Sequence, residues 1–337
     1  MVNPIRYSVI GTSWITDTFI EGAAATGKLR LAAVYSRTAE RAQAYAARYG
    51  VSRTFTDLAE MACSAEIDAV YIASPNALHV EQSRLFLEHG KHVICEKPLA
   101  AHPEEVAALQ ELAAQKGVVY MEAIMYRHQP QRAILEQALA SIGNITLARL
   151  DFSQLSSKYS AYLRGECPNI FNPAMETGAL MDLGIYCVYP ALALFGYPTR
   201  IQAAATFLTT GADGSGSAVL QYPDKQVVLT YSKTGQTAVP SEFQGDRGTV
   251  TVASISKLED IRRIDADGTV QLWGSAEKPV LMGHEADSFA RYIADPAGSR
   301  GEYEENSRLA REVARCMAEI RRLAGIRFPS DPILKSD

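Results

Sequence analysis

A lysine held at the end of a strand is the first candidate for chemistry in this sequence. Lys97 lies in the stretch VICEKPLA, where an apolar run ends and Pro98 fixes the backbone directly after the lysine. The carboxyl ends of parallel strands form the ligand crevice of a sheet. An amine there can exchange a proton with an alcohol or ketone oxygen that lies within about 3 Å. A structural contact of Lys97 with Glu96 or with a phosphate is the alternative.

A carboxylate and a phenol form the second candidate. Asp182 and Tyr186 lie in TGALMDLGIYCVYP at positions i and i+4, which places them on one face of a helix. Polar side chains on an otherwise apolar helix need partners when they are buried. The pair is therefore expected to orient a polyol and to supply a second proton donor. The alternative is that Tyr186 packs in the core with its hydroxyl group bonded to the protein.

The turn VIGTSWITDTF has the layout of a dinucleotide-binding loop. A short strand-like run reaches Gly11 and a helical period follows, but Ser13 and Thr16 occupy the other two glycine positions of G-x-G-x-x-G. Ser13 is small and can donate a hydrogen bond, so close approach of a pyrophosphate is partly retained. An ordinary strand-to-helix turn is the other interpretation. The residues expected to hold the pyrophosphate are Gly11, Thr12, Ser13, Trp14 and Ile15.

The end of the next strand-like run bears on the choice of cofactor. An NAD enzyme usually places an acidic residue about 20 positions after the glycine loop. VYSRTAER has no acid at the strand tip and offers Ser36, Arg37 and Arg41, whose donors suit a ribose 2′-phosphate. The sequence therefore favours NADP as the cofactor, with NAD as the second choice. An ordinary solvated helix start is the competing interpretation.

A further stretch, IASPNALHVEQ, follows another strand-like run at the same expected edge of the sheet. Asn76 is expected either to contact the cofactor or to cap the next helix. His79 is expected either to contact the cofactor or to be a half-buried surface histidine. The other cofactor-binding candidates at this edge are Ser74, Pro75 and Glu96.

The expected frame for these motifs is an α/β fold with two domains. Strand-like and helix-like segments alternate over residues 1–123, which predicts a Rossmann-type, doubly wound parallel sheet that binds NAD(P). Residues 124–337 are expected to form an α+β domain for substrate binding and oligomerisation. Short strand-like runs joined by GADGSG, YPDK and GDRG predict its large, open, mostly antiparallel sheet. We expect this sheet to form a homodimer or homotetramer, and the C-terminal helix to pack back on the first domain.

Composition excludes several classes of protein. Acidic residues outnumber basic ones 38 to 33 without a basic cluster, so no nucleic-acid partner is expected. No apolar run is expected to span a membrane, and the start lacks the pattern of a signal peptide. Five scattered cysteines fit reduced thiols, and the histidines form no metal-binding motif. The expectation is a cytoplasmic protein without a metal.

Four signatures, taken in order, resemble the glucose–fructose oxidoreductase, inositol dehydrogenase and rhizopine-catabolism (Gfo/Idh/MocA) family. They are the Gly11 loop, SPNALH at 74–79, EKP at 96–98 and GALMDLGIY at 178–186. The segments MEAIMYRHQP and RLAREVARCMAEIRRLAGI also look like this family, so the resemblance covers nearly the whole chain. It implies a Rossmann domain followed by a domain whose open sheet mediates oligomers.

The resemblance also implies roles for individual residues. Lys97 would lie near the nicotinamide and the reacting oxygen, and Arg127 near the nicotinamide, the phosphates and the substrate. The inositol dehydrogenase branch carries D-x-x-x-H, whereas Asp182 and Tyr186 are similar to the glucose–fructose oxidoreductase and dimeric dihydrodiol dehydrogenase branches. There the tyrosine exchanges the proton with help from the lysine. METGALMDLGIY departs from the family at Glu176 and Thr177, with an open effect on the pocket.

These observations predict an NAD(P)-dependent dehydrogenase or reductase acting on CH–OH groups. Hydride would pass between C4 of the nicotinamide and a secondary alcohol or ketone of a sugar, cyclitol or dihydrodiol-like substrate. Lys97 and Tyr186 would act on the substrate oxygen, while Asp182 positions a neighbouring hydroxyl group. One alternative is a non-catalytic NADP-binding sensor, against which the retained Lys97 and Tyr186 argue. Another is an NAD-dependent glycosidase that oxidises its substrate transiently.

Overall fold

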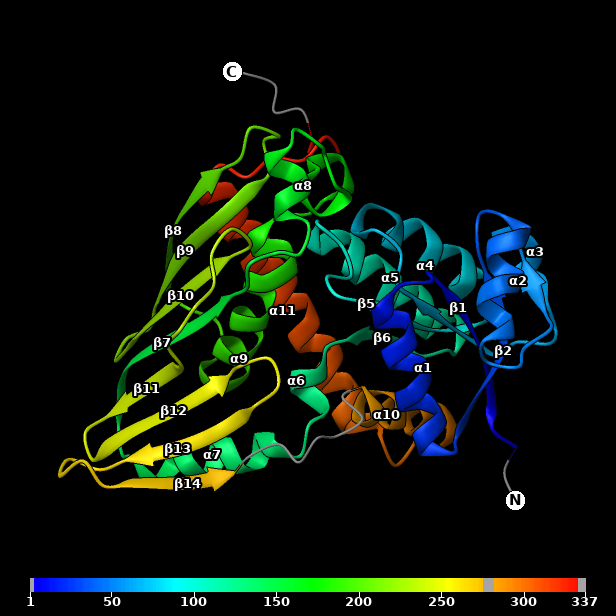
Figure 1. Cartoon of the computed structure of the whole chain (residues 1–337). Helices are drawn as coiled ribbons and strands as arrows, with labels where there is room; N and C mark the ends of the chain where they lie inside the picture. The colour runs from blue at the N-terminus through cyan, green and yellow to red at the C-terminus, as the bar shows by residue number, and fades with distance from the viewer. Residues whose placement is uncertain (1–2, 275–281, 333–337) are drawn as a thin grey trace. The chain divides into compact units, whose positions relative to one another are not determined.

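The chain divides into two compact units (Figure 1). The computed structural model describes residues 3–274 and 282–332. The first unit comprises Met1–Gln129 and Glu277–Arg311, and the second comprises Pro130–Ala276 and Glu312–Asp337. Helix α11 (Arg300–Ala324) therefore contributes residues to both units. A boundary between functional domains at residues 123 and 124 stays a prediction.

The first unit is built on a parallel sheet, as the sequence predicted, and this sheet has six strands. Its strand order is β3-β2-β1-β4-β5-β6, so the order reverses between β1 and β4. Such a reversal is the switch point at which doubly wound sheets bind ligands. The strands are β1 (Ile5–Ile10), β2 (Leu29–Tyr35), β3 (Thr54–Phe55), β4 (Ala69–Ile72), β5 (His92–Glu96) and β6 (Tyr120–Ala123).

Local signals set the ends of the helices in this unit. The Thr38 hydroxyl accepts the Arg41 amide at the start of α2, and Gly117 takes a left-handed conformation (φ 68°) after α5. Phe19 stacks on Tyr71 at 3.8 Å, and Phe289 of α10 lies in the same core cluster. The helices are α1 (Trp14–Thr26), α2 (Ala39–Ala47), α3 (Leu58–Cys63), α4 (His79–Glu88), α5 (Pro103–Lys116), α6 (Met125–His128), α10 (Gly283–Ala294) and the short 3-10 helix η1 (Asn76–Leu78).

The second unit carries an eight-stranded sheet of order β14-β13-β12-β11-β7-β10-β9-β8. All of its strand pairs are antiparallel except β10 with β7, which agrees with the predicted mostly antiparallel sheet. The strands are β7 (Ile145–Ser153), β8 (Arg200–Phe207), β9 (Asp213–Gln221), β10 (Gln226–Ser232), β11 (Ser241–Gly245), β12 (Gly248–Ser254), β13 (Glu259–Ile264) and β14 (Val270–Gly274).

Helices cover one face of this sheet, where α9 packs on β7 and β10 (Figure 1). Hydrophobic side chains that alternate along the strands, such as Val227, Leu229 and Tyr231 of β10, are buried in the core of the unit. The remaining helices are α7 (Gln131–Ser141), α8 (Tyr159–Leu163), η2 (Asn169–Phe171), η3 (Pro173–Met175), the π-helix η4 (Leu180–Gly184) and α9 (Ile185–Phe195).

The expectation that no apolar run could span a membrane is wrong for one segment. Pro173–Phe195 is long and apolar enough by length and composition, with a mean hydropathy of 1.6. However, 67% of its apolar window is buried inside the protein, as in the core helix of a globular fold. Its apolar character follows from packing against the eight-stranded sheet.

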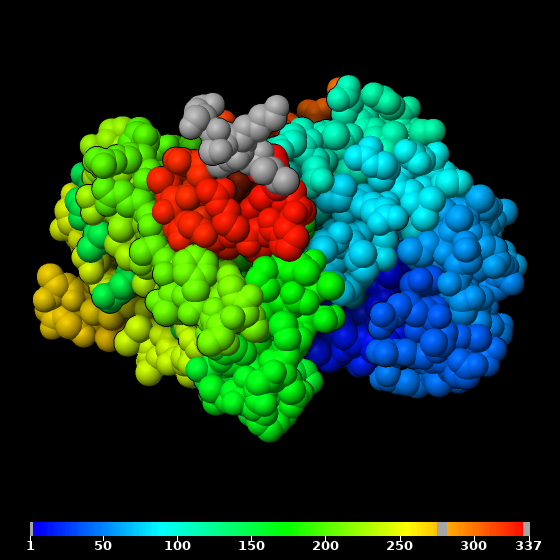
Figure 2. All heavy atoms as spheres, turned by 90° about the horizontal axis from the view of Figure 1, so that it is seen from above, coloured from blue at the N-terminus to red at the C-terminus, as the bar shows by residue number. Residues whose placement is uncertain are grey.

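Residues 325–332 follow α11 in the second unit, and this end of the described chain is red in Figure 2. The Ser330 hydroxyl group donates a hydrogen bond to the Glu176 carboxylate. Asp331 pairs with Arg321 at 2.5 Å and accepts the Phe328 amide at 2.9 Å. This segment is therefore fixed beside the loop that precedes η4.

Candidate active site

Lys97 lies directly after the carboxyl end of β5, as predicted. It is partly buried and is joined to Pro98 by a cis peptide bond. The preceding carboxylate of Glu96 accepts a hydrogen bond from the Tyr71 hydroxyl group of β4 at 2.7 Å. Desolvation raises the pKa of Glu96, against the lowering effect of the Lys97 ammonium and the Tyr71 hydroxyl group. The lysine is thus placed at the ligand edge of the sheet, directly after a carboxyl group whose pKa is raised by burial.

His79 joins the loops that follow β4 and β5. The ring is fully buried, with Nδ1 2.8 Å from the Pro98 carbonyl oxygen and Nε2 2.9 Å from the Ser74 carbonyl oxygen. Carbonyl oxygens only accept, so the ring can donate to both only when both nitrogens carry protons. The interpretation of His79 as a surface residue is therefore wrong. A role as a direct cofactor contact stays a prediction.

The SPN segment forms a tight turn in front of α4. Asn76 begins the 3-10 helix η1, and Leu78, whose side chain makes no cap, takes the N-cap position of α4. Both expected roles of Asn76, as a helix cap and as a cofactor contact, stay predictions. The Ser74 hydroxyl group donates to Gln82 at 2.7 Å, and Pro75 precedes the turn with φ −58°. These residues line the carboxyl end of β4.

The glycine loop keeps the first glycine for a clear steric reason. Gly11 has φ 111°, and a Cβ there would lie 2.5 Å from the Ala73 carbonyl oxygen. Ser13 begins α1 without a side-chain cap, whereas Thr16 at the third glycine position is fully buried. Trp14 is 75% exposed. The turn therefore leads into a helix N-terminus, which favours a phosphate group by its unpaired amides and its dipole.

Arg41 reaches the glycine loop from α2. Its Nε donates to the Thr12 hydroxyl group at 2.9 Å, so the predicted phosphate-binding arginine and turn lie together. Ser36 at the end of β2 is buried, with its amide bonded to the Phe55 carbonyl oxygen at 3.2 Å, whereas Arg37 is exposed. Two guanidinium groups thus flank the strand tip where a dinucleotide places its ribose.

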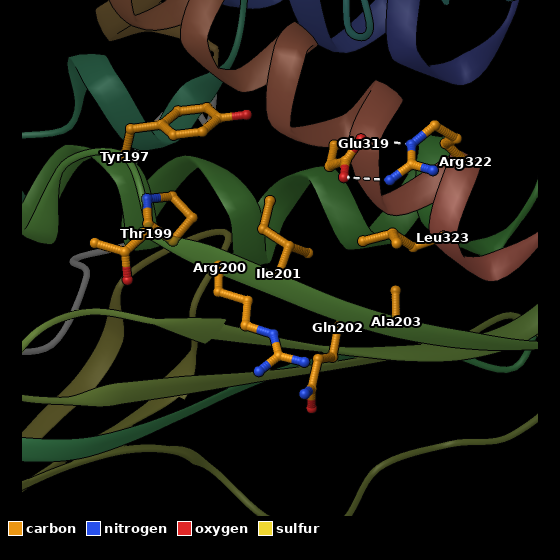
Figure 3. A pocket seen from close by; sticks show the side chains of 10 residues that line it. Tyr197, Thr199, Arg200, Ile201, Gln202, Ala203, Glu319, Arg322 and Leu323 are labelled. Carbon is orange, nitrogen blue, oxygen red and sulfur yellow. Dashed lines mark hydrogen bonds and ion pairs between the residues drawn. The ribbon is translucent and has the colours of Figure 1, made fainter.

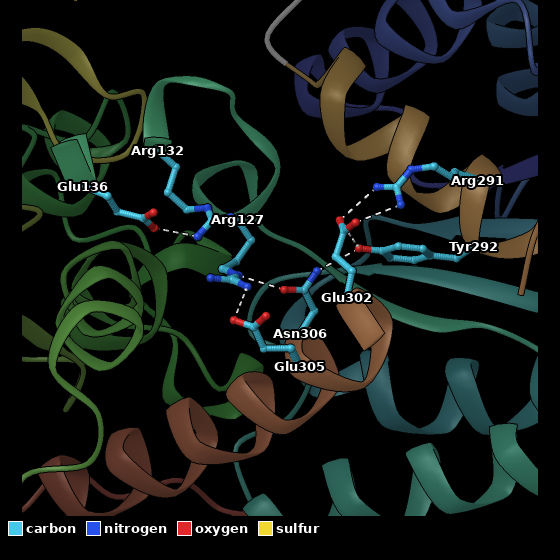
Figure 4. Close-up of polar contacts among 8 residues, drawn as sticks. All are labelled: Arg127, Arg132, Glu136, Arg291, Tyr292, Glu302, Glu305 and Asn306. Atoms are coloured by element: carbon cyan, nitrogen blue, oxygen red, sulfur yellow. Dashed lines mark hydrogen bonds and ion pairs between the residues drawn. The ribbon is translucent and has the colours of Figure 1, made fainter. Parts of the chain in front are cut away.

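Arg127 is committed to a network with α11 (Figure 4). Its side chain is 4% exposed and pairs with Glu305 at 3.0 Å, while Nε donates to Asn306 at 2.8 Å. Asn306 in turn donates to the Tyr292 hydroxyl group at 2.8 Å, and that hydroxyl group donates to Glu302 at 2.8 Å. The network fixes α6 within the first unit, and the predicted role of Arg127 in cofactor and substrate binding stays a prediction.

The second unit supplies Asp182 and Tyr186 from consecutive helices. Asp182 lies in η4 and Tyr186 in α9, and both are half-buried on a segment whose other side chains are mostly buried. The Tyr186 ring packs edge-to-face on Phe152 with centroids 5.0 Å apart. Single-turn π-helices are frequent at functional sites. The full burial of Tyr186 in the core, which was the alternative, is not what the structure shows.

Lys233 is a site residue that the sequence did not predict. It follows β10, is almost fully buried and pairs with the Asp182 carboxylate. Its Nζ also donates to the Ile170 carbonyl oxygen at 2.7 Å. In the sequence, SKTG looks like an ordinary turn after a strand, and no local pattern indicates the partner.

Asp213 is the second residue that the sequence missed. This fully buried first residue of β9 accepts the Leu180 amide at 2.7 Å and so holds the start of η4. Burial raises the pKa of Asp213 to about 6, although the Leu180 N–H group lowers it. A Cβ at Gly178 would collide with the Asp213 carboxylate, which explains the glycine before ALMD.

The two departures from the family pattern have structural partners. Glu176 takes a left-handed conformation (φ 55°) and accepts the Ser330 hydroxyl group. The Thr177 hydroxyl group donates to the Asn169 carbonyl oxygen at 2.7 Å. Both side chains are buried, so they shape the loop before η4 from within the protein.

A cavity of about 680 Å³ lies elsewhere in the second unit, between β8 and the end of α11 (Figure 3). Tyr197, Arg200 and Gln202 line it together with the ion pair of Glu319 and Arg322, whose atoms are 2.7 Å apart. None of the predicted site residues lines this cavity.

Comparison with known proteins gives matches along most of the chain. Residues 5–124 match the family described as "Oxidoreductase family, NAD-binding Rossmann fold", and residues 135–251 match "GFO/IDH/MocA C-terminal domain". The chain is 40% identical to scyllo-inositol 2-dehydrogenase (NADP(+)) IolU of Bacillus subtilis, over 97% of this chain and 99% of that protein. It is 29% identical to trans-1,2-dihydrobenzene-1,2-diol dehydrogenase of Mus musculus, over 65% of each.

Solved structures show the same fold. KijD10, a 3-ketoreductase from Actinomadura kijaniata in complex with NADP and TDP-benzene, matches with a TM-score of 0.82, at 22% identity over 95% of this chain and 98% of that chain. Aldose-aldose oxidoreductase from Caulobacter crescentus matches with a TM-score of 0.81, at 19% identity over 96% and 98%.

Proposed function

The chain belongs to the GFO/IDH/MocA family of oxidoreductases with an NAD-binding Rossmann fold, and from this premise we propose that it interconverts a secondary alcohol and a ketone of a cyclitol. The observation that carries the proposal is Lys97, held at the carboxyl end of β5 beside the switch point of the sheet. The 40% identity to a scyllo-inositol dehydrogenase supports a cyclitol before a sugar or a dihydrodiol. The half-buried Asp182 carboxylate suits a substrate with several hydroxyl groups.

The proposed roles follow from the chemistry of each side chain. A bound NADPH supplies the hydride when the ketone is reduced. Tyr186 donates its hydroxyl proton to the oxygen of the substrate, and Lys97 donates a hydrogen bond to the same oxygen. Asp182 accepts a hydrogen bond from a neighbouring hydroxyl group. In the oxidation, Tyr186 takes the proton back.

The test is turnover with a panel of inososes, ketoses and their alcohols, followed by the near-ultraviolet absorbance of the reduced nicotinamide. Turnover by the natural protein and its loss in Lys97→Met support the proposal. A protein that binds NADPH but turns over none of the panel would be a sensor. Release of an aglycone from a glycoside without net change of the cofactor would indicate the glycosidase alternative.

We propose NADP as the preferred cofactor, supported by the contact of Arg41 with Thr12 in the glycine loop. Arg41→Ala should weaken NADPH binding about tenfold, equivalent to about 1.4 kcal/mol, and leave NADH binding within twofold. Arg48→Ala on the same helix is the control, because Arg48 pairs with Asp17. The exposed Trp14 provides the fluorescence signal in a Trp273→Phe background. Comparable affinity of the natural protein for both cofactors would contradict the preference.

We also propose a cytoplasmic homodimer or homotetramer that binds neither nucleic acid nor membrane. Val270 and Leu272, two exposed apolar side chains on the edge strand β14 of the eight-stranded sheet, support an oligomer. The molar mass in solution, measured by light scattering, tests it, and a monomer at micromolar concentration would contradict it.

A further inference from the structure

Lys233 is a buried cation of the second unit that the proposed reaction does not use. Its Nζ has three neighbours: the Asp182 carboxylate, the Ile170 carbonyl oxygen at 2.7 Å and the Phe171 ring at 5.2 Å from the centroid. Lysine is almost never fully buried unless it is paired. The ammonium group is therefore held in place by Asp182 and by the η2 segment together.

Asp182 and Lys233 are exposed to solvent to different degrees, and this difference decides which of the two side chains a ligand would contact. The Asp182 side chain is 18% exposed and the Lys233 side chain 5%. The carboxylate is thus the accessible member, and the ammonium group lies beneath it. A substrate hydroxyl group would contact Asp182, while Lys233 acts on the substrate only through Asp182.

The backbone of Lys233 is fixed by neighbouring segments. Its amide donates to the Gly214 carbonyl oxygen at 2.8 Å, and its carbonyl oxygen accepts the Ser156 amide at 2.9 Å. Asp213, next to Gly214, holds the first amide of η4. Asp213 of β9 thus fixes the start of the helix that carries Asp182, and Lys233 at the end of β10 fixes the Asp182 carboxylate. Support of this kind gives a binding group a defined orientation.

We propose that Lys233 is a positioning residue that aims the Asp182 carboxylate at a hydroxyl group of the substrate and links it to the η2 segment. This inference rests on the proposed function for the substrate, a neutral polyol. The part of the substrate that is recognised would be a hydroxyl group beside the reacting carbon. The Asp182 carboxylate would bind this group in an orientation that Lys233 fixes.

The first test compares two lysines at opposite ends of β10. Lys233→Met should raise the KM for the polyol at least tenfold and leave the KM for NADPH within twofold. Asp182→Asn should raise the polyol KM similarly, and the double variant should be no worse than either single one, because both changes remove the same interaction. Lys225→Met is the matched control, since Lys225 pairs with the exposed Asp224 in a turn, and its polyol KM should not change.

The second test is thermal unfolding, which does not depend on activity. Lys233→Met should lower the Tm by about 5 °C or more, because it leaves a carboxylate without its cation. Adding Asp182→Asn should recover at least half of that loss. Lys233→Arg keeps the positive charge, so its KM for the polyol should lie between that of Lys233→Met and that of the natural protein.

The outcomes separate this inference from the proposed function. An unchanged polyol KM in Lys233→Met, with an active natural protein, overturns the inference alone. A natural protein that turns over no polyol overturns the proposed function. In that case the Tm values still test the pairing of Lys233 with Asp182. A double variant whose Tm loss is the sum of the two single losses also overturns the pairing, whereas a double variant that recovers part of the Lys233→Met loss supports it.

Discussion

Each unit buries a carboxyl group near the start of a helix, but the two groups have different neighbours. Glu285 in the first turn of α10 is 1% exposed, and within the described residues neither of its oxygens has a hydrogen-bond partner. Asp213 is equally buried, yet it accepts the Leu180 amide. Burial raises the pKa of Glu285 well above its usual range, with Glu96 adding to the shift, but raises that of Asp213 only to about 6.

The difference between the pKa shifts of Glu285 and Asp213 follows from the groups that surround each carboxyl group. For Glu285, burial is the first cause of the raised pKa, and the other cause, the Glu96 carboxyl group, raises it further. Near Asp213 the Leu180 amide lowers the pKa, the Asp182 carboxylate raises it, and the Lys233 ammonium lowers it by a smaller amount.

The largest expected effect distinguishes two lysines. Lys97 is proposed to contact the reacting oxygen, whereas Lys233 lowers the pKa of Asp213. Lys97→Met should lower kcat by about 10²–10⁴, because it removes a donor to the reacting oxygen, and should leave NADPH binding largely intact. Lys91→Met is the control, because Lys91 directly precedes the strand β5 that Lys97 directly follows. Lys91 donates to the carbonyl oxygens of Ser64 and Ile67, so its loss should lower stability and not kcat.

Steady-state kinetics and NADPH titration measure the two quantities. Retained turnover in Lys97→Met would remove the lysine from the proposed chemistry. A loss in kcat by Lys233→Met as large as that by Lys97→Met would break the distinction between a reacting lysine and a positioning one.

The next effect is on stability in the first unit. The pKa of Glu285 is raised above 4.5 in the folded state, so the folded protein loses stability as the pH rises through and above that value. Glu285→Met removes this loss and the two buried oxygens that have no partner among the described residues, so it should be more stable at about pH 8 by about 1–3 kcal/mol. The gain should shrink near pH 4.5. Urea unfolding at both pH values measures it, and an equal gain at both would point to packing alone.

The sequence predicted the parts of the site that depend on local patterns. The β5 strand followed by Lys97 and Pro98 follows from residues that are neighbours in the chain. The shared face of Asp182 and Tyr186 stays a prediction, because Asp182 lies in the π-helix η4 and Tyr186 in α9. The parallel sheet follows equally from the alternation of strands and helices, whereas its strand order was not predicted.

The residues that support the site could not be found in this way. Lys233 is 51 residues from Asp182, and Asp213 is 33 residues from Leu180, so their partners appear only when the sheet is assembled. Glu285 looks like a favourable acidic residue at a helix start. Only the close contact of α10 with α1, where a Cβ at Gly22 would lie 2.8 Å from the Gly283 nitrogen, buries it.

The smallest effect concerns Asp213 and completes the comparison. Its folded pKa of about 6 exceeds the ordinary 3.8, so the folded protein loses stability as the pH rises from about 4 to 6 and no more above that. Asp213→Asn keeps an acceptor for the Leu180 amide but cannot ionise. The free energy of unfolding of this variant should be higher by roughly 1–2 kcal/mol at pH 7.5 and unchanged at pH 4. The gain is smaller than the full pKa shift implies, because the amide NH₂ group must take the place of an oxygen that has no hydrogen-bond partner among the described residues. Unfolding curves of Glu285→Met and Asp213→Asn across this range decide the comparison. A larger gain for Glu285→Met supports the role of Lys233 and the Leu180 amide in moderating the buried charge, and equal gains would mean that burial alone sets both.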